Sequence, residues 1–397
     1  MIVAVNAGSS SVKFAVFDAP TLHRRLSGHA ERIGQAGASL ALRFNGSGGT
    51  ERRELSAGGI DAAVEAVVAT VKVQARGHAV TAIGHRVVHG GPRLLEHQII
   101  TTHVLDELQA ASPLDPAHLP AAIRLIEACG VAFPGVPQYA CFDTAFHRDM
   151  PAVAQMLPIP RRFLRAGVRR YGFHGLSYTY LMQRLEETAG PAAANGRVIL
   201  AHLGSGASMA AVRGGRAIDT TMAFTPTAGL VMGTRPGDLD PGLLSYLIRS
   251  GAVTPDGLDH FINKECGLLG VSETSADVRD LVARRADDPR AADAIDLFCY
   301  QARKHIGALT ATLGGLDTLV FSGGIGEHSA VVRSQICAGL EHLGVVLEEH
   351  KNAAGNGEIS AGAGASASQM PVSVRVIATD EEQVIAQFVR SRCSPGE

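Results

Sequence analysis

The chain has 397 residues, of which 46% are hydrophobic and 19% are charged, and its formal net charge is −2. This length favours two domains, because a single hydrophobic core stops growing beyond roughly 250–300 residues, and the near-neutral charge gives no sign of a nucleic-acid-binding surface. No stretch approaches the roughly 20 apolar residues of a membrane span, and the six cysteines form no Cys-x-x-Cys pair, so we expect a cytoplasmic protein with reduced thiols and no membrane contact.

The first predicted element is a hairpin, with apolar strands over residues 2–5 and 12–17. Asn6 and the Gly-Ser loop interrupt the first apolar run, which argues against a signal peptide. The loop supplies Gly8, hydroxyl groups and a run of backbone N–H groups, which suit a phosphate or a hydrated cation. An ordinary turn is the alternative. The candidate phosphate ligands here are Ser9, Ser11 and Lys13.

The rest of the first half predicts a β-rich segment followed by alternating helices and strands. The expected elements are sheet and loop over residues 20–58, a helix at 60–76, a strand at 82–91, helices at 101–111 and 118–129, and a strand at 139–142. Residues 151–175 are rich in proline and arginine and mark the passage to a second half, which starts with a helix at 177–188.

The second half begins with a segment that repeats the residue pattern of the first hairpin. Residues 198–212 have the same order of apolar run, polar residue, Gly-Ser loop and apolar run, offset by 196 residues, from Asn6 to His202. The repeat predicts two related halves that face each other across a cleft, with a phosphate loop from each side as in an ATPase. Coincidence between two glycine-rich hairpins is the alternative. The candidate ligands of the second loop are His202, Gly204, Ser205 and Gly206.

The remaining elements predict more helix, two strands and a closing helix. Residues 224–240 form a loop too long for a simple turn, which indicates function. Helices are expected within 241–313, a strand at 318–322, a tight loop at 323–328, a helix at 329–343, a strand at 374–378 and a helix at 380–390 that returns to the first half. We therefore expect an α/β fold with one domain over residues 1–147 plus 380–397 and another over 148–379.

The glycine-rich turn after the strand at 318–322 is a candidate nucleotide site. Glycines let a base or ribose approach the backbone, and a following helix N-terminus favours anions. The spacing is not that of a Rossmann fingerprint and the P-loop signature is absent, while a plain strand–helix turn remains the alternative. Its candidate ATP contacts are Gly324, Ile325, Gly326 and Glu327.

Several charged or histidine residues stand where a ligand could explain them. Arg86 lies in an apolar strand and Arg235 in the long loop, and two arginines from different halves could clamp a carboxylate and a phosphoryl group. Structural salt bridges are the alternative. Asp143 and Glu381 stand at a strand end and a helix start, as Mg²⁺ ligands often do; capping of that helix explains Asp380 equally well. His174, between glycines, could contact a phosphoryl group.

Seven motifs taken together are similar to those of the acetate kinase family. They are Asn6–Ser11, Gly84–Gly91, Phe142–His147, Tyr171–Gly175, His202–Gly204, Gly233–Arg235 and Gly324–Glu327. The resemblance spans nearly the whole chain. It implies two duplicated actin-like ATPase domains of the ribonuclease H-like type, a homodimer, and direct in-line phosphoryl transfer between ATP and acetate, giving ADP and acetyl phosphate. The implied metal is Mg²⁺, with Mn²⁺ as an alternative.

The resemblance also implies roles for individual residues. Arg86 and Arg235 hold the acetate carboxylate and the transferring phosphoryl group, which His174 steadies. Asp143 and Glu381 organise Mg²⁺, with Asn6 nearby. A small apolar pocket for the methyl group is implied for Val88, Leu114, Phe173 and Pro226.

The chain departs from the family pattern at several positions. Asp115 replaces a histidine of the active site, unless His118 substitutes for it, and Ser205 stands for an asparagine of the second phosphate loop. Asp380 replaces an asparagine, and Pro236 follows Arg235. These changes bear on nucleotide affinity, turnover and acyl preference more than on the type of reaction. A propionate or broader short-chain acyl kinase is the closest rival, and a non-catalytic ATP-gated binding module of the same fold is the rival from another class.

Overall fold

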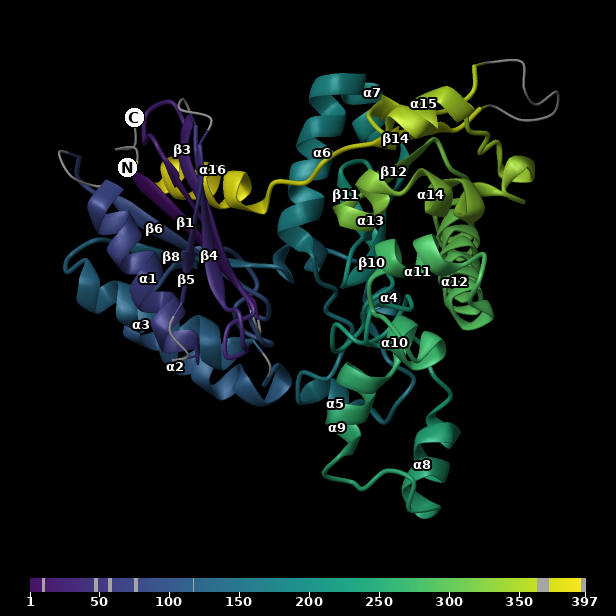
Figure 1. The fold of residues 1–397 in the computed structure, drawn as a ribbon, viewed down its shortest axis with the longest axis horizontal. Coiled ribbons are helices and arrows are strands. Elements are labelled where there is room, and N and C mark those ends of the chain that lie inside the picture. The colour runs from purple at the N-terminus through teal and green to yellow at the C-terminus, as the bar shows by residue number, and fades with distance from the viewer. Residues whose placement is uncertain are drawn as a thin grey trace. The chain divides into compact units, whose positions relative to one another are not determined.

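The computed structural model describes residues 1–8, 11–45, 49–55, 59–74, 78–116, 118–362 and 371–393. The chain divides into two compact units (Figure 1). The first comprises Met1–Ala145 together with Asp380–Glu397, and the second comprises Phe146–Thr379. Within the described residues no helix is both long and apolar enough to cross a bilayer.

The first unit is built on one mixed sheet with the strand order β5-β4-β3-β2-β1-β6-β8-β7. Its strands are β1 (Ile2–Ala7), β2 (Val12–Phe17), β3 (Arg24–Glu31), β4 (Ser39–Phe44), β5 (Thr50–Glu54), β6 (Ala82–Val87), β7 (Gln98–Ile99) and β8 (Gln138–Phe142). Its helices are α1 (Gly59–Gln74), α2 (Thr102–Ala111), α3 (Leu119–Ala132) and α16 (Glu381–Cys393). All of the residues of β1 are buried, as expected for a strand covered on both faces.

Helices cover the central strands of this sheet from sequence positions far apart. Apolar residues of α1 and α3 join those of β1 and β2 in one buried cluster. The last helix, α16, packs against β1 and β6. Its approach depends on Gly84, because a Cβ atom there would lie 2.3 Å from Ile385 and 2.8 Å from Val389. The predicted return of the final helix to the first half is therefore confirmed.

The second unit has its own mixed sheet, with the order β11-β10-β9-β12-β14-β13. Its strands are β9 (Arg197–Leu203), β10 (Ala207–Arg213), β11 (Arg216–Thr220), β12 (Thr318–Ser322), β13 (Gly357–Glu358) and β14 (Ser373–Val376). Its helices are α4 (Ala152–Gln155), α5 (Arg161–Arg165), α6 (Gly175–Ala189), α7 (Pro191–Asn195), α8 (Pro241–Arg249), α9 (Leu258–His260), α10 (Gly267–Ser272), α11 (Val278–Arg284), α12 (Pro289–Leu313), α13 (Gly323–His328), α14 (Ala330–Cys337) and α15 (Glu349–Ala354).

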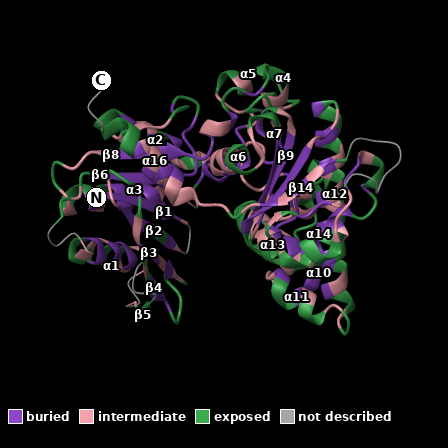
Figure 2. Ribbon diagram, turned by 90° about the horizontal axis from the view of Figure 1, so that it is seen from above, coloured by how far each residue is buried: buried purple, intermediate pink, exposed green. Residues whose placement is uncertain are grey.

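The core of the second unit lies on both sides of its central strands, which are buried in Figure 2. Tyr178 and Leu181 of α6 share a buried cluster with residues of β9, β10 and β12, while α12 packs against β9, β10 and β11. The ends of α12 are set by the sequence. The Asp288 side chain accepts a hydrogen bond from Arg290 N at the first turn, and Gly314 ends the helix in the left-handed region.

The two sheets repeat one topology, which is the physical basis of the predicted duplication. In the first unit β1 pairs antiparallel with β2 and parallel with β6. In the second, β9 pairs antiparallel with β10 and parallel with β12. Extending both series gives β3-β2-β1-β6-β8 against β11-β10-β9-β12-β14. The expected α/β class with two related actin-like domains is confirmed.

Two predicted elements of the second unit are wrong. Residues 323–328 are the short helix α13 and not a tight loop, and the helix expected to reach residue 343 ends at Cys337. In the second case the next residues form a separate 3₁₀ turn, Glu341–Leu343. Glycine-rich sequence predicts a turn by default, and here tertiary contacts of Glu327, described below, override that local preference.

Buried histidines make the stability of both units sensitive to acid. Burial lowers the pKa of His85 in β6 to about 4, and the hydrogen bond of its Nε2 with Gln138 Oε1 opposes that shift only in part. Burial also lowers the pKa of His147 to about 4, and the hydrogen bond with Phe173 O likewise opposes the shift. Both side chains are therefore neutral in the folded protein at pH 7.

We predict that the protein loses stability as the pH falls from about 6.5 towards 4. In that window the unfolded chain binds protons that the folded histidines exclude, so stability is fully present above pH 6.5 and each group removes on the order of 3 kcal/mol. Urea unfolding midpoints at pH 7.5 and pH 5 measure this loss. The substitution His85→Gln should reduce the difference between the two midpoints.

The matched control for this test is His103→Gln, because His103 is an exposed histidine on α2 of the same unit. It should leave the pH difference unchanged. Equal differences for wild type, His85→Gln and His103→Gln would show that burial of His85 has no part in the acid sensitivity.

Candidate active site

The first unit gathers its candidate residues at one edge of the sheet. Strands β1, β6 and β8 are parallel neighbours, so their carboxyl ends meet at the same edge, where ligands bind in open α/β sheets. Asn6 is opposite Arg86 in the strand register. Asp143 follows β8 directly, and its backbone N donates to Val87 O over 3.0 Å.

Arg86 contacts Asn6, Asp143 and Glu381. Its Nε and NH2 atoms lie 3.0 and 2.5 Å from Asp143 Oδ2, and its NH1 donates to Asn6 Oδ1 over 2.9 Å. Its Nε also lies 3.6 Å from Glu381 Oε2. The Arg86 side chain is 16% exposed and that of Asp143 is wholly buried. The structural salt bridge that sequence reasoning kept as an alternative is thus present, and the same contacts place the guanidinium at the sheet edge.

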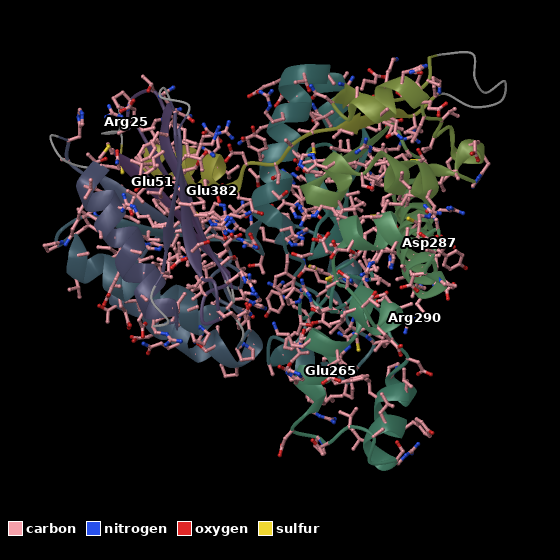
Figure 3. The ribbon with its side chains drawn as sticks, viewed as in Figure 1. Arg25, Glu51, Glu265, Asp287, Arg290 and Glu382 are labelled. Atoms are coloured by element: carbon pink, nitrogen blue, oxygen red, sulfur yellow. The ribbon has the colours of Figure 1, made fainter. Side chains whose placement is uncertain are left out.

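The charges around Arg86 keep it protonated. Burial by itself would lower the pKa of Arg86, but the carboxylates of Asp143 and Glu381 raise it above its ordinary value. The opposite shift occurs at Glu382, where burial and the neighbouring Glu381 charge raise the pKa of the carboxyl group. Glu382 stands on the first turn of α16 (Figure 3), and Asn6 Nδ2 donates to Glu381 Oε2 over 2.8 Å and to Glu382 Oε1 over 3.4 Å.

The start of α16 is fixed by its neighbour in the sequence. Asp380 Oδ1 accepts from Gln383 N over 3.0 Å, which is the predicted capping contact, and the same carboxylate binds Arg24. This cap holds Glu381 and Glu382 against Asn6. Sequence analysis did not single out Glu382, and the acidic run at the start of the helix is the signal that could have indicated its place in the cluster.

The cluster suits a divalent cation that arrives with its own ligands. It combines three carboxylates with one guanidinium, an excess of negative charge. Within the described ranges no group of three or more His, Cys, Asp or Glu side chains could by itself hold a metal ion. Mg²⁺ seldom relies on protein ligands alone, since it binds one or two carboxylates together with waters and substrate phosphates. Asn6, Asp143 and Glu381 therefore fit a nucleotide-borne Mg²⁺.

The other candidates of the first unit lie close to this edge in sequence. Ser9 falls outside the described residues, while Gly8 N donates to Ser11 O over 2.7 Å and closes a tight turn. Lys13 is exposed and opposite Asn6 in register. Val88 is buried just after β6, and Leu114 packs on a cluster containing Val87 and Phe142.

Asp115, which replaces a histidine of the family pattern, contacts His118. Asp115 is buried, and its Oδ1 lies 2.8 Å from Nδ1 of His118, whose side chain is 26% exposed. The carboxylate therefore orients the nearby imidazole. The structure thus pairs the two residues between which the sequence left the question open.

In the second unit, His174 is held in an uncommon backbone conformation. Its φ of 59° and ψ of 24° lie in the left-handed region at the start of α6, which costs a residue with a side chain about 1–2 kcal/mol. Its Nδ1 lies 2.9 Å from Ser208 Oγ, and Tyr178 OH bonds the same hydroxyl. The imidazole is thus oriented by two buried groups that sequence reasoning missed.

His202 lies directly against His174. The two rings stack with centroids 4.3 Å apart and an interplanar angle of 26°. His202 Nδ1 is 2.8 Å from Ser177 Oγ. A Cβ atom built on Gly204 would lie 3.8 Å from His202 Nε2, which places that nitrogen beside the Gly-Ser loop.

Arg235 reaches the same loop from residues 224–240. Gly233 N donates to Ser205 O over 3.2 Å and ties the two loops together, while Arg235 NH1 donates to Pro226 O over 2.5 Å. A Cβ atom on Gly206 would lie 2.7 Å from Arg235 NH2 and 3.5 Å from His174 Nε2. Arg235 and His174 therefore both lie over Gly206, which is the convergence expected of groups that contact one phosphoryl group.

The glycine-rich turn ends in a carboxylate with a structural role. Glu327 Oε1 accepts from Gly323 N over 2.9 Å and from Thr379 N over 3.2 Å. Buried Arg333 donates to Gly326 O and Glu327 O, each over 2.8–2.9 Å, at the end of α13. Gly324 is exposed and Ile325 is partly buried. These contacts hold the backbone of the candidate nucleotide site in place.

Each unit thus brings most of its own candidates together. In the first, Asn6, Arg86, Asp143 and Glu381 share contacts; in the second, His174, His202, Gly206 and Arg235 do. Phe173, the residue before His174, is buried, and its carbonyl oxygen lies 3.0 Å from His147 Nε2. Ser208 pairs with His202 in register as Lys13 pairs with Asn6, but the sequence offset of 196 residues aligns Ser208 with Val12 and so did not indicate it. Nothing local in the sequence indicated Ser177 or Thr379.

Comparisons with known proteins show the family of this chain. The acetokinase family model matches residues 1–387. The chain is 42% identical over 393 residues to an acetate kinase of Rhodopseudomonas palustris, covering 98% of this chain and 97% of that protein. It is 40% identical over 395 residues to an acetate kinase of Bacillus subtilis, covering 98% of both.

Two solved structures match the fold along almost the whole chain. One is the acetate kinase of Porphyromonas gingivalis, with a TM-score of 0.86 and 35% identity over 98% of each chain. The other is a propionate kinase of Francisella tularensis, with a TM-score of 0.89 and 34% identity over 97% of this chain and 98% of that one. On these findings, the chain belongs to the acetokinase family.

Proposed function

We propose that this member of the family catalyses reversible, Mg²⁺-dependent phosphoryl transfer from ATP to acetate, giving acetyl phosphate and ADP. The observation that carries the proposal is Arg86, a guanidinium held between Asn6, Asp143 and Glu381 at the edge of the sheet. A planar fork of donors binds a carboxylate in a fixed orientation, which a lysine would not do. Residues of the second unit supply the complementary phosphate side.

The reaction needs positioning rather than acid–base chemistry. A carboxylate is already a nucleophile at pH 7, so no general base is required, and the enzyme aligns the reactants and stabilises charge on a loose transition state. Arg86 orients the acetate carboxylate, and Arg235 with His174 stabilises the equatorial oxygens of the transferring group. When bound, Mg²⁺ neutralises phosphate charge, and Asn6, Asp143 and Glu381 would hold it. Direct in-line transfer predicts inversion at the γ-phosphorus.

The nucleotide and the acyl group are assigned to separate sets of residues. His202, the loop 204–206, the turn 324–327 and the first loop with Ser9, Ser11 and Lys13 bind ATP or ADP in this proposal. The methyl group of acetate occupies an apolar pocket of Val88, Leu114, Phe173 and Pro226. The buried or partly buried state of these four side chains supports an apolar surrounding.

Cellular setting and assembly are also proposals. We place the protein in the cytoplasm, which the six free cysteines support, and as a homodimer without nucleic-acid or membrane partners. On α8, Leu243 and Tyr246 are 40% and 59% exposed, and large apolar side chains at a surface are consistent with a contact to a second copy.

The acyl-phosphate product is the direct test of the proposal. With ATP, Mg²⁺ and acetate, we expect hydroxylamine to trap acetyl phosphate as a hydroxamate. Substitution of propionate for acetate should lower kcat/KM by roughly 10–200-fold, the range that one methylene group commands in a tight apolar pocket. A preference for propionate would favour the rival activity, to which the Francisella structure gives its one support. ATP binding without any acyl phosphate would instead indicate a binding module.

The two arginines should each be essential for turnover. We expect Arg86→Ala and Arg235→Ala to lower kcat by at least ~10³, because each removes preorganised charge stabilisation of the transition state. Arg86→Lys keeps a positive charge beside buried Asp143 but loses the planar set of guanidinium donors. It therefore tests the role of those donors in turnover while preserving the charge balance needed for folding. If Arg86→Lys retains wild-type kcat, the arginine is only the structural ion pair. Circular dichroism of each variant checks that it is folded.

Gly206 offers a test of the convergence over the second loop. The substitution Gly206→Ala puts a methyl group 2.7 Å from Arg235 NH2, so the guanidinium must move, and we expect at least a tenfold loss of kcat/KM with little change in Tm. The matched control is Gly307→Ala in α12, where a Cβ atom meets nothing within 4 Å. Equal activity of both variants would contradict the role of Arg235.

A further inference from the structure

A chain of hydroxyl groups leads to His202 from the end of the second unit. Thr379 Oγ1 donates to Ser177 Oγ over 2.8 Å, and Ser177 Oγ lies 2.8 Å from His202 Nδ1. Ser177 is fully buried and Thr379 is partly buried. Neither residue belongs to the motifs that identify the family, and none of the roles assigned above uses either side chain.

Thr379 occupies a particular place in the chain. It is the last residue of the second unit, directly before the helix cap Asp380 and the carboxylate of Glu381. Its backbone N donates to Glu327 Oε1, which also accepts from Gly323 N. One residue therefore connects the start of α13, through its backbone, with α6 and His202, through its hydroxyl group.

The direction of the Thr379–Ser177 hydrogen bond favours one position for the proton of His202. Thr379 supplies the proton in its bond to Ser177, so the Ser177 oxygen is an acceptor there. A serine hydroxyl has one proton of its own, which is available for the 2.8 Å contact with His202 Nδ1. In the neutral imidazole the accepting nitrogen is unprotonated, and the other nitrogen, Nε2, then carries the hydrogen.

The position of Nε2 makes this tautomer suitable for donating a hydrogen bond to phosphate. Nε2 is the nitrogen beside Gly204, on the loop that Arg235 and His174 also approach through Gly206. An N–H group there can donate to a phosphate oxygen, whereas the other tautomer would present a lone pair and repel it. Stacking on His174, with centroids 4.3 Å apart, fixes the plane of the ring.

We propose that Ser177 and Thr379 are positioning residues that hold His202 as the Nε2–H tautomer, ready to donate to a nucleotide phosphate oxygen. This deepens the proposed function, on which it rests for the identity of the ligand. The hydroxyl pair acts before substrate arrives, since its members contact one another and the imidazole but not the reacting atoms.

The tautomer can be measured directly on the full-length protein. Uniform ¹⁵N-histidine labelling and long-range ¹H–¹⁵N correlation distinguish a protonated from an unprotonated ring nitrogen, and His202→Asn assigns the signals. We expect wild-type His202 to show an unprotonated Nδ1 and a protonated Nε2. Ser177→Ala and Thr379→Val should mix the two tautomers. Thr379→Val keeps both the shape and the backbone N–H that binds Glu327, and Thr379→Ser should restore the wild-type pattern.

Kinetics provide the second readout. Loss of one donor to a charged phosphate should raise KM for ATP by about 3–10-fold in Thr379→Val and Ser177→Ala, with kcat changed much less. The matched control, Thr188→Val, removes an exposed hydroxyl on α6 that bonds Arg184 O, and it should behave as wild type. Thr379→Ser should recover the wild-type KM.

Two results would overturn the proposal. One is a wild-type His202 protonated at Nδ1, and the other is a Thr379→Val protein with the wild-type tautomer and wild-type KM. The NMR measurement needs no substrate, so its outcome is independent of whether acetyl phosphate is formed. A failure of the proposed function would appear in the hydroxamate assay and a failure of the positioning role in the imidazole spectrum.

Discussion

A guanidinium group in a protein interior needs an anion or a full set of hydrogen-bond acceptors around it, and the ion pair of Arg86 with Asp143 meets that condition in the first unit. The pair explains why polar residues stand at or just after the carboxyl ends of three neighbouring strands. Asp143 is wholly buried and balanced by one cation, while Asn6 orients both Arg86 and Glu381 through its two amide atoms. Removing either Arg86 or Asp143 breaks this buried pair, so the geometry proposed for binding a carboxylate also stabilises this edge of the sheet.

The two units carry different sets of polar side chains on one scaffold. The same strand topology places Asn6 beside Arg86 in the first sheet and His202 beside Ser322 in the second. Likewise Lys13 opposes Asn6, and Ser208 opposes His202. At matching positions the first unit therefore carries charged and amide groups suited to a carboxylate and a cation. The second carries imidazole and hydroxyl groups that orient one another. Conservation of the backbone pattern with replacement of the side chains is how a duplicated fold acquires two functions.

Much of this could be predicted from the sequence, and the failures have a common cause. The hairpins, the central strands and the internal repeat follow from period-two and apolar runs, and the helix cap at Asp380 follows from its side chain. The members of the cluster around Arg86 were predicted from polar and charged residues near the ends of strands and at the start of the last helix. By contrast, α13 forms where glycines predict a turn. Its own Glu327 side chain accepts from Gly323 N and from the distant Thr379 N, and Arg333 of the next helix binds the carbonyl oxygens at its end. Ser177, Thr379 and Tyr178 were missed for the same reason: they are ordinary residues whose partners are distant in sequence.

The packing of α16 on Gly84 has a consequence for synthesis of the protein on the ribosome. Domains generally begin to fold in the order in which they emerge, yet the first sheet is covered on the face of β1 and β6 by a helix from the last residues of the chain. The N-terminal unit therefore cannot complete its core when its own first 145 residues have emerged. The second unit, whose residues are continuous, can finish first, and the earliest part of the chain must wait with an apolar surface exposed until the residues of α16 have emerged.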